Sequence, residues 1–72
     1  MSKQNEEATY NIARAFHQIG ILELAVSYYH KLLSFSVSEN LKREAAYNLS
    51  LIYRESSSPE LANKILIDYI TV

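Results

Sequence analysis

The sequence predicts an all-α fold of four short antiparallel helices. Composition is the first observation: the 72 residues include one glycine and one proline, and 49% are hydrophobic. So few turn-forming residues suit helices and leave little for the turns of an all-β fold. Internal repetition is the second: residues 8–16 align with residues 45–53, an offset of 37 residues from position 8 to position 45. A turn signal and an apolar stretch follow each copy, which indicates two helix–turn–helix units.

The first unit is predicted over residues 6–34. Its first helix is expected from Glu6 to Ile19. Gly20 is expected to end it, because glycine adopts the left-handed cap conformation at little cost in free energy. Its second helix is expected from Leu22 to Ser34. At helical spacing, the inward positions of the first helix are Ile12, Ala15, Phe16 and Ile19. Those of the second helix are Ala25, Tyr28, Tyr29, Leu32 and Leu33.

The second unit is predicted over residues 39–72. Ser38 is expected to cap the N-terminus of a helix from Glu39 to Glu55. Ser58 is expected to cap the fourth helix, which begins at Pro59, where the missing N–H costs nothing, and ends near Ile70. Loops this short place successive helices antiparallel.

Charge and residue types exclude several classes of function. Net charge is −1, so no basic excess is present to neutralise a phosphate backbone, and direct nucleic-acid binding is not expected. Cysteine is absent, and the longest apolar runs are far shorter than a membrane span. His17 and His30 lack the HExxH arrangement of a zinc site and lack catalytic partners. The chain is therefore predicted not to be an enzyme and to use no cofactor, metal or small-molecule substrate.

The repeated pattern resembles the tetratricopeptide repeat (TPR) family over nearly the whole chain. The first copy matches the family pattern at Ile12, Ala13, Phe16, Gly20, Ala25, Tyr29 and Leu32. The second copy matches it at Leu49, Ser50, Tyr53, Ala62, Leu66 and Tyr69. Small residues in this pattern let paired helices approach closely, and large residues fill the gaps beside them. Thr9 and Ala46 stand where the family has a large aromatic residue, and Val37 stands at its closing proline. The resemblance implies two TPR units stacked as a short right-handed solenoid.

A narrower resemblance concerns residues 15–31 and 43–53. Within them, residues 15–21, 24–31 and 43–53 are similar to the last repeats of the TPR-array subunit of transcription factor IIIC, an assembly factor of RNA polymerase III. This implies a protein–protein interaction scaffold in RNA polymerase III transcription initiation, at the C-terminal tip of a longer array. It also implies a nuclear location and other transcription-complex subunits as partners. A generic TPR adaptor in another complex, or a co-chaperone, is the alternative and implies a cytoplasmic location.

Tyr10 and Tyr47 occupy equivalent positions that resemble the groove-facing side of the first helix in a TPR unit. Residues one or two turns away share these faces, because positions three and four apart are neighbours on a helix. The predicted partner-binding residues are therefore Tyr10, Asn11, Arg14, His17, Tyr47, Asn48, Leu51 and Arg54. The carboxylate clamp of co-chaperone TPR domains is not expected, since two repeats supply too few converging cations. Glu6 and Glu7 are interpreted as carboxylates favoured by the helix dipole.

The fourth helix carries more apolar residues than one contact face can hold. They are Leu61, Ile65, Leu66, Ile67, Tyr69 and Ile70. Because a surface helix normally keeps one apolar stripe, this distribution predicts contact on a second side. Ile67 and Ile70 are therefore predicted to form an end face that docks another chain, which is either a transcription-complex partner or a second copy.

Overall fold

A computed structural model describes the backbone of residues 3–70 and the side chains of residues 5–70. The prediction of an all-α fold is confirmed, since the described residues form helices and no strands. The helices are α1 (Lys3–Ile19), α2 (Leu22–Phe35), α3 (Glu39–Glu55) and α4 (Pro59–Tyr69). Three of the four predicted start positions are correct, and α1 begins three residues before the predicted Glu6.

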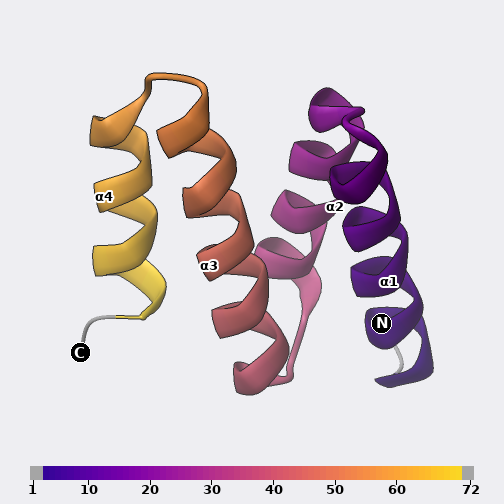
Figure 1. Ribbon diagram of the computed structural model, residues 1–72. Helices are drawn as coiled ribbons and strands as arrows, with labels where there is room; N and C mark the ends of the chain where they lie inside the picture. The colour runs from indigo at the N-terminus through magenta and orange to yellow at the C-terminus, as the bar shows by residue number, and fades with distance from the viewer. Residues whose placement is uncertain (1–2, 71–72) are drawn as a thin grey trace.

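The helices follow one another across the molecule in chain order (Figure 1). The most extensive contacts join α1 to α2 and α3 to α4, and α2 packs on α3 between the two pairs. A smaller contact joins α1 to α3, whereas α4 packs on α3 alone among the described helices. The result is a flat stack of two helical hairpins, 33 × 31 × 13 Å in extent, as expected for a short repeat solenoid.

The turns that close the two hairpins have the same backbone geometry but different residues. Gly20 has φ 84°, which confirms the predicted left-handed cap of α1. The residue 37 positions further on, Ser57, has φ 61° in the turn between α3 and α4. The amide of Ile21 donates to the carbonyl of Phe16 at 2.9 Å, and that of Ser58 donates to Tyr53 at 2.7 Å. The second turn therefore holds an ordinary L-residue in a conformation that favours glycine.

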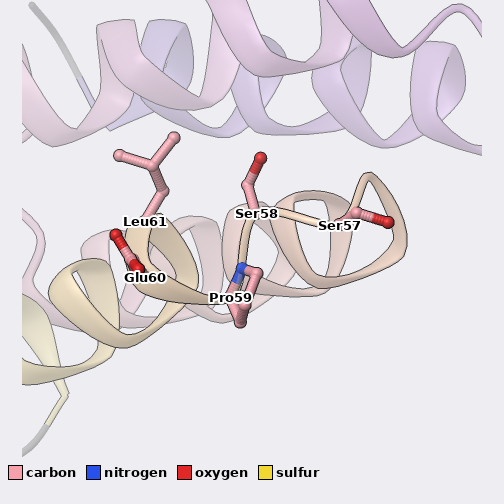
Figure 2. Close-up of a pocket in the computed structure, with 5 residues that line it drawn as sticks. All are labelled: Ser57, Ser58, Pro59, Glu60 and Leu61. Atoms are coloured by element: carbon pink, nitrogen blue, oxygen red, sulfur yellow. The ribbon is translucent and has the colours of Figure 1, made fainter.

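The two predicted serine caps have different outcomes. Ser38 caps α3 as predicted, because its hydroxyl accepts from the amide of Leu41 at 3.3 Å. The prediction for Ser58 is wrong: it occupies the N-cap position of α4, but its side chain makes no capping hydrogen bond. Its φ of −121° and ψ of 62° lie outside the extended region in which a side chain reaches back to the helix amides. Figure 2 shows Ser58 beside Pro59, which begins the helix as predicted.

Small residues lie where the helices cross. Their side chains are fully buried at Ala13, Ala25, Ala45, Ala46 and Ala62. Larger side chains fill the space between them, chiefly Tyr29, Leu32, Leu49 and Ile52. Tyr69, predicted to fill such a gap, is instead 37% exposed because no helix follows α4 within the described residues.

The predicted inward face of α1 is largely wrong. Ile12 is 42% exposed, Ile19 is 68% exposed and Ala15 is also exposed. The stripe that packs on α2 lies next to this one and includes Ala13 and Phe16. Both stripes are apolar at helical spacing, so the spacing alone did not distinguish the packed stripe from the open one.

Glu6 ties the start of α1 to the segment that joins the two hairpins. Its carboxylate is fully buried and accepts hydrogen bonds from the Ser36 hydroxyl, from the Val37 amide at 2.9 Å and from the Ser38 amide at 3.1 Å. The bond from Ser36 is the main reason that the pKa of this carboxyl lies below its ordinary value, and the two amides act in the same direction. The interpretation of Glu6 as a helix-dipole carboxylate was therefore incomplete, because it also positions the second hairpin against the first.

Candidate groove between α1 and α3

A groove of about 540 Å³ lies between α1 and α3. Ile70, the residue that follows α4, also contributes to its lining. Its lining residues are Tyr10, Arg14, Arg43, Glu44, Tyr47, Asn48 and Ile70. Four predicted partner-binding residues from two different helices therefore converge on one surface.

The hydroxyl of Tyr10 is the centre of the polar contacts in this groove. It accepts from the side-chain amide of Asn48 at 3.1 Å and from the guanidinium of Arg14 at 3.5 Å. The Tyr10 ring packs at 6.2 Å from the buried ring of Tyr29, and the Arg14 guanidinium carbon lies 5.9 Å from the centre of the Tyr10 ring. Tyr10 thus contributes to the packing between the hairpins as well as to the groove, which the sequence analysis did not predict.

Asn48 fixes the position of Tyr10 relative to α3. The same side-chain nitrogen that contacts Tyr10 also donates to the backbone carbonyl of Glu44 at 2.9 Å. Its two N–H groups are therefore both engaged within the chain. An asparagine held in this way is a positioning residue of the groove wall.

The groove also carries two cations, one carboxylate and an aromatic ring that the fold leaves accessible. Arg14, Arg43 and Glu44 are all exposed. The hydrogen bond with Tyr10 is the main cause that raises the pKa of Arg14 above its ordinary value, so Arg14 stays cationic. Tyr47 is 55% exposed. Arginine and tyrosine are enriched among residues that dominate protein interfaces.

The other four predicted groove residues lie elsewhere. Asn11 and Arg54 are exposed and Leu51 is half-buried, but none of them lines the groove. His17 points toward the interior of the first hairpin, where its Nδ1 atom lies 3.4 Å from the Tyr29 hydroxyl. Burial, with a smaller contribution from the nearby Tyr10, raises the pKa of Tyr29 to about 12.

The two predicted end-face residues have different environments. Ile67 is 64% exposed on α4. Ile70 is half-buried, packs against the core cluster and lines the groove. Only Ile67 therefore presents most of its side chain to solvent.

Arg43 and Glu44 are groove residues that the sequence analysis missed. They precede Tyr47 and Asn48 by four positions, one helical turn, and so share their face of α3. Positions four residues before a side chain share its helix face as fully as positions four residues after it, so the same spacing is a signal for both residues.

Two further hollows are less suited to binding. One, of about 350 Å³, is formed by five consecutive residues around the start of α4, Ser57–Leu61 (Figure 2). The other, of about 360 Å³, lies between the start of α2 and the end of α3, and Glu23 is its one ionisable group apart from Tyr53. Neither gathers converging charged groups. Within the described residues, no group of three or more histidine, aspartate or glutamate side chains could hold a metal ion. No helix in the described part of the chain is long and apolar enough to cross a bilayer.

Comparison with known proteins shows which proteins the chain is related to. It is 39% identical to the transcription factor tau 131 kDa subunit of Saccharomyces cerevisiae, in an alignment that covers 96% of the chain. It is 38% identical to human general transcription factor 3C polypeptide 3 over 93% of the chain. It is 36% identical to the transcription factor tau subunit sfc4 of Schizosaccharomyces pombe, also over 93% of the chain.

The chain is similar to subunits of transcription factor IIIC. The resemblance predicted from residues 15–31 and 43–53 is therefore confirmed. The chain spans only 7–9% of the length of these relatives. No protein-family profile matches the chain, and no solved structure matches it.

Proposed function

We propose that this chain is a protein–protein interaction segment of a transcription factor IIIC subunit, acting in the nucleus in RNA polymerase III transcription. The observation that carries the proposal is the convergence of Arg14, Arg43 and Tyr47 on one groove in a chain similar to transcription factor subunits. All three side chains are exposed. The proposed ligand is an extended segment of another subunit that carries acidic and apolar side chains, because the groove combines two cations with tyrosine and isoleucine.

The co-chaperone alternative receives less support from the groove. Clamping a carboxylate requires several free donors that converge on one anion. Asn48 is not a free donor, because its amide nitrogen already contacts Tyr10 and the Glu44 carbonyl.

The proposal is tested by placing this chain in the Saccharomyces cerevisiae tau 131 kDa subunit in place of the segment that aligns with it. The chimera is assembled with the other subunits of the yeast factor, and its transcription by RNA polymerase III is measured. Arg43→Glu is the test variant, because it reverses a groove cation. Arg54→Glu is the matched control, since it makes the same change on an exposed residue of α3 outside the groove.

We expect the unsubstituted chimera to assemble and to support transcription. Arg43→Glu should weaken subunit association on the order of ten-fold, as expected for an interface arginine, while Arg54→Glu should have little effect. Equal assembly and transcription with both variants would show that the groove binds no subunit.

A further inference from the structure

Glu6 joins α1 to the linker between the two hairpins, residues 36–38. Its carboxylate oxygen Oε1 accepts from the Ser36 hydroxyl, from the Val37 amide at 2.9 Å and from the Ser38 amide at 3.1 Å. The start of α1 and this linker lie at the same edge of the molecule (Figure 1). Hydrogen bonds to a charged acceptor are stronger than those between neutral groups, so Glu6 holds the linker firmly against α1.

The hold on the linker reaches α3 directly, because Ser38 is both the last linker residue and the N-cap of that helix. While the Ser38 amide donates to Glu6, its hydroxyl accepts from the amide of Leu41 at 3.3 Å. The Ser38 carbonyl accepts from the amide of Lys42 at 3.0 Å. A displacement of the linker therefore displaces the first turn of α3 as well.

The two helices that Glu6 connects are the two walls of the groove. On α1, Tyr10 and Arg14 follow Glu6 by four and eight positions, so the three side chains lie along one side of the helix. On α3, the groove residues Arg43 and Glu44 lie in the second turn, directly after the turn that Ser38 caps. The position of the linker relative to α1 therefore bears on the distance between the walls.

Direct packing contributes little to that distance. Among the described helices that touch, α1 and α3 have the smallest contact. Hydrogen bonds supplement it: the Glu6 carboxylate holds the linker, and the Asn48 side chain donates to the Tyr10 hydroxyl at 3.1 Å. Glu6 is fully buried, whereas Tyr10 is half-buried. Because water competes less with a buried hydrogen bond, the bonds of Glu6 have the stronger influence on the spacing.

The presence of a carboxylate at this buried position also needs a reason. Removing a carboxylate from water costs free energy, and an apolar side chain of similar volume avoids that cost. An apolar side chain cannot bind two backbone amides and a hydroxyl in a fixed direction. The charge at position 6 is therefore explained by the geometry that it imposes on the linker.

We propose that Glu6 is a positioning residue for the groove. Through the linker, its carboxylate sets the spacing between α1 and α3, and with it the separation of Arg14 and Arg43 on the two walls. The effect of this spacing on a partner rests on the function proposed above, whereas the spacing itself does not.

The test measures the spacing in the complete 72-residue chain. The chain contains no cysteine, so two introduced cysteines can be labelled with nitroxides and their separation measured by pulsed electron paramagnetic resonance. The pair Asn11→Cys and Asn40→Cys reports the distance between α1 and α3. The pair Asn40→Cys and Asn63→Cys reports the distance between α3 and α4 within the second hairpin. All three asparagines are exposed.

Two variants release the linker from opposite sides. Glu6→Ala removes the acceptor, and Ser36→Ala removes one donor from a buried position with little change in volume. Glu7→Ala is the matched control, because it removes a carboxylate from the exposed neighbour of Glu6 on the same turn of α1. Circular dichroism checks that each variant stays helical. If Glu6→Ala loses helicity, Ser36→Ala decides the question alone.

Glu6→Ala should change the mean distance between α1 and α3 and broaden its distribution, while the distance between α3 and α4 stays the same. Ser36→Ala should have a smaller effect in the same direction. The double variant should not exceed Glu6→Ala, because both changes act on one hydrogen-bond network. Glu7→Ala should leave both distances unchanged. In the yeast chimera, Glu6→Ala should weaken subunit association several-fold, less than the roughly ten-fold loss expected for Arg43→Glu.

The same distances between α1 and α3 in both linker variants and in the unsubstituted chain would overturn the proposal. So would a change in both measured distances, which would show that Glu6 stabilises the fold as a whole. Normal association of the Glu6→Ala chimera, where Arg43→Glu weakens it, would overturn the role of Glu6 in the groove. If Arg43→Glu had no effect, the proposed function would be rejected instead, and the distances would still decide what Glu6 does.

Discussion

The turn residues Gly20 and Ser57 offer a paired test of backbone strain, because equivalent positions hold different residues in the same conformation. Their φ angles are 84° and 61°. We expect Gly20→Ala to destabilise the fold and Ser57→Gly to stabilise it. Opposite signs at equivalent positions would be hard to obtain from any cause other than the backbone.

The expected size follows from the geometry of the turn. A Cβ atom added at Gly20 would meet no atom within 4 Å, so the cost of Gly20→Ala comes from the backbone alone. The left-handed conformation costs an L-residue roughly 1–2 kcal/mol. Alanine recovers roughly 0.4–1 kcal/mol of this by restricting the unfolded chain. The net loss is about 1 kcal/mol, and Ser57→Gly should gain a similar amount.

Thermal unfolding followed by circular dichroism measures both changes. For a domain of this size, about 1 kcal/mol corresponds to a shift in Tm of roughly 4–8 °C. The Tm should fall for Gly20→Ala and rise for Ser57→Gly. All proteins are compared at one fixed concentration, because association makes Tm depend on protein concentration. If both variants shifted Tm in the same direction, or if neither shifted it, the assignment of strain to these two positions would be wrong.

Two further predictions concern the core. Ala25 and Ala62 are fully buried where helices pair, so changing either to Leu should overpack the crossing and cost roughly 1–3 kcal/mol in urea unfolding; unchanged unfolding midpoints would contradict the packing assignment. Tyr29 has a folded-state pKa of about 12 against an ordinary value of 10.0, so its contribution to stability is complete below pH 10 and is lost as pH rises toward 12. Over that window the loss should approach roughly 2 kcal/mol, and Tyr29→Phe should remove it while Tyr47→Phe, on an exposed ring, should not; equal alkaline sensitivity in all three proteins would refute the burial argument.

Part of the candidate site was predictable and part was not. Tyr10, Arg14, Tyr47 and Asn48 were found because equivalent repeat positions and helical spacing place them on corresponding faces. Leu51 and Arg54 obey the same spacing but lie outside the groove. His17 also shares the face of Tyr10, yet its ring is drawn toward Tyr29 by the packing of α1 on α2. Spacing along one helix does not reveal how the neighbouring helix is rotated against it.

By itself, the sequence determined the number of helices, all but one of their boundaries to within one residue, and the equivalence of positions 37 residues apart. These features depend on local preferences: Gly20 ends a helix, Pro59 begins one, and small residues recur at matched positions. Three features were decided only by the tertiary structure: the open face of α1, the buried carboxylate of Glu6 and the strained turn at Ser57. The first two depend on which helix or loop packs against a given surface, and the Glu6 carboxylate meets residues that lie far along the chain. The third depends on the backbone angle that closing the second hairpin imposes on Ser57. Residue type and apolar periodicity specify neither the packing partner of a surface nor a backbone angle that tertiary structure imposes.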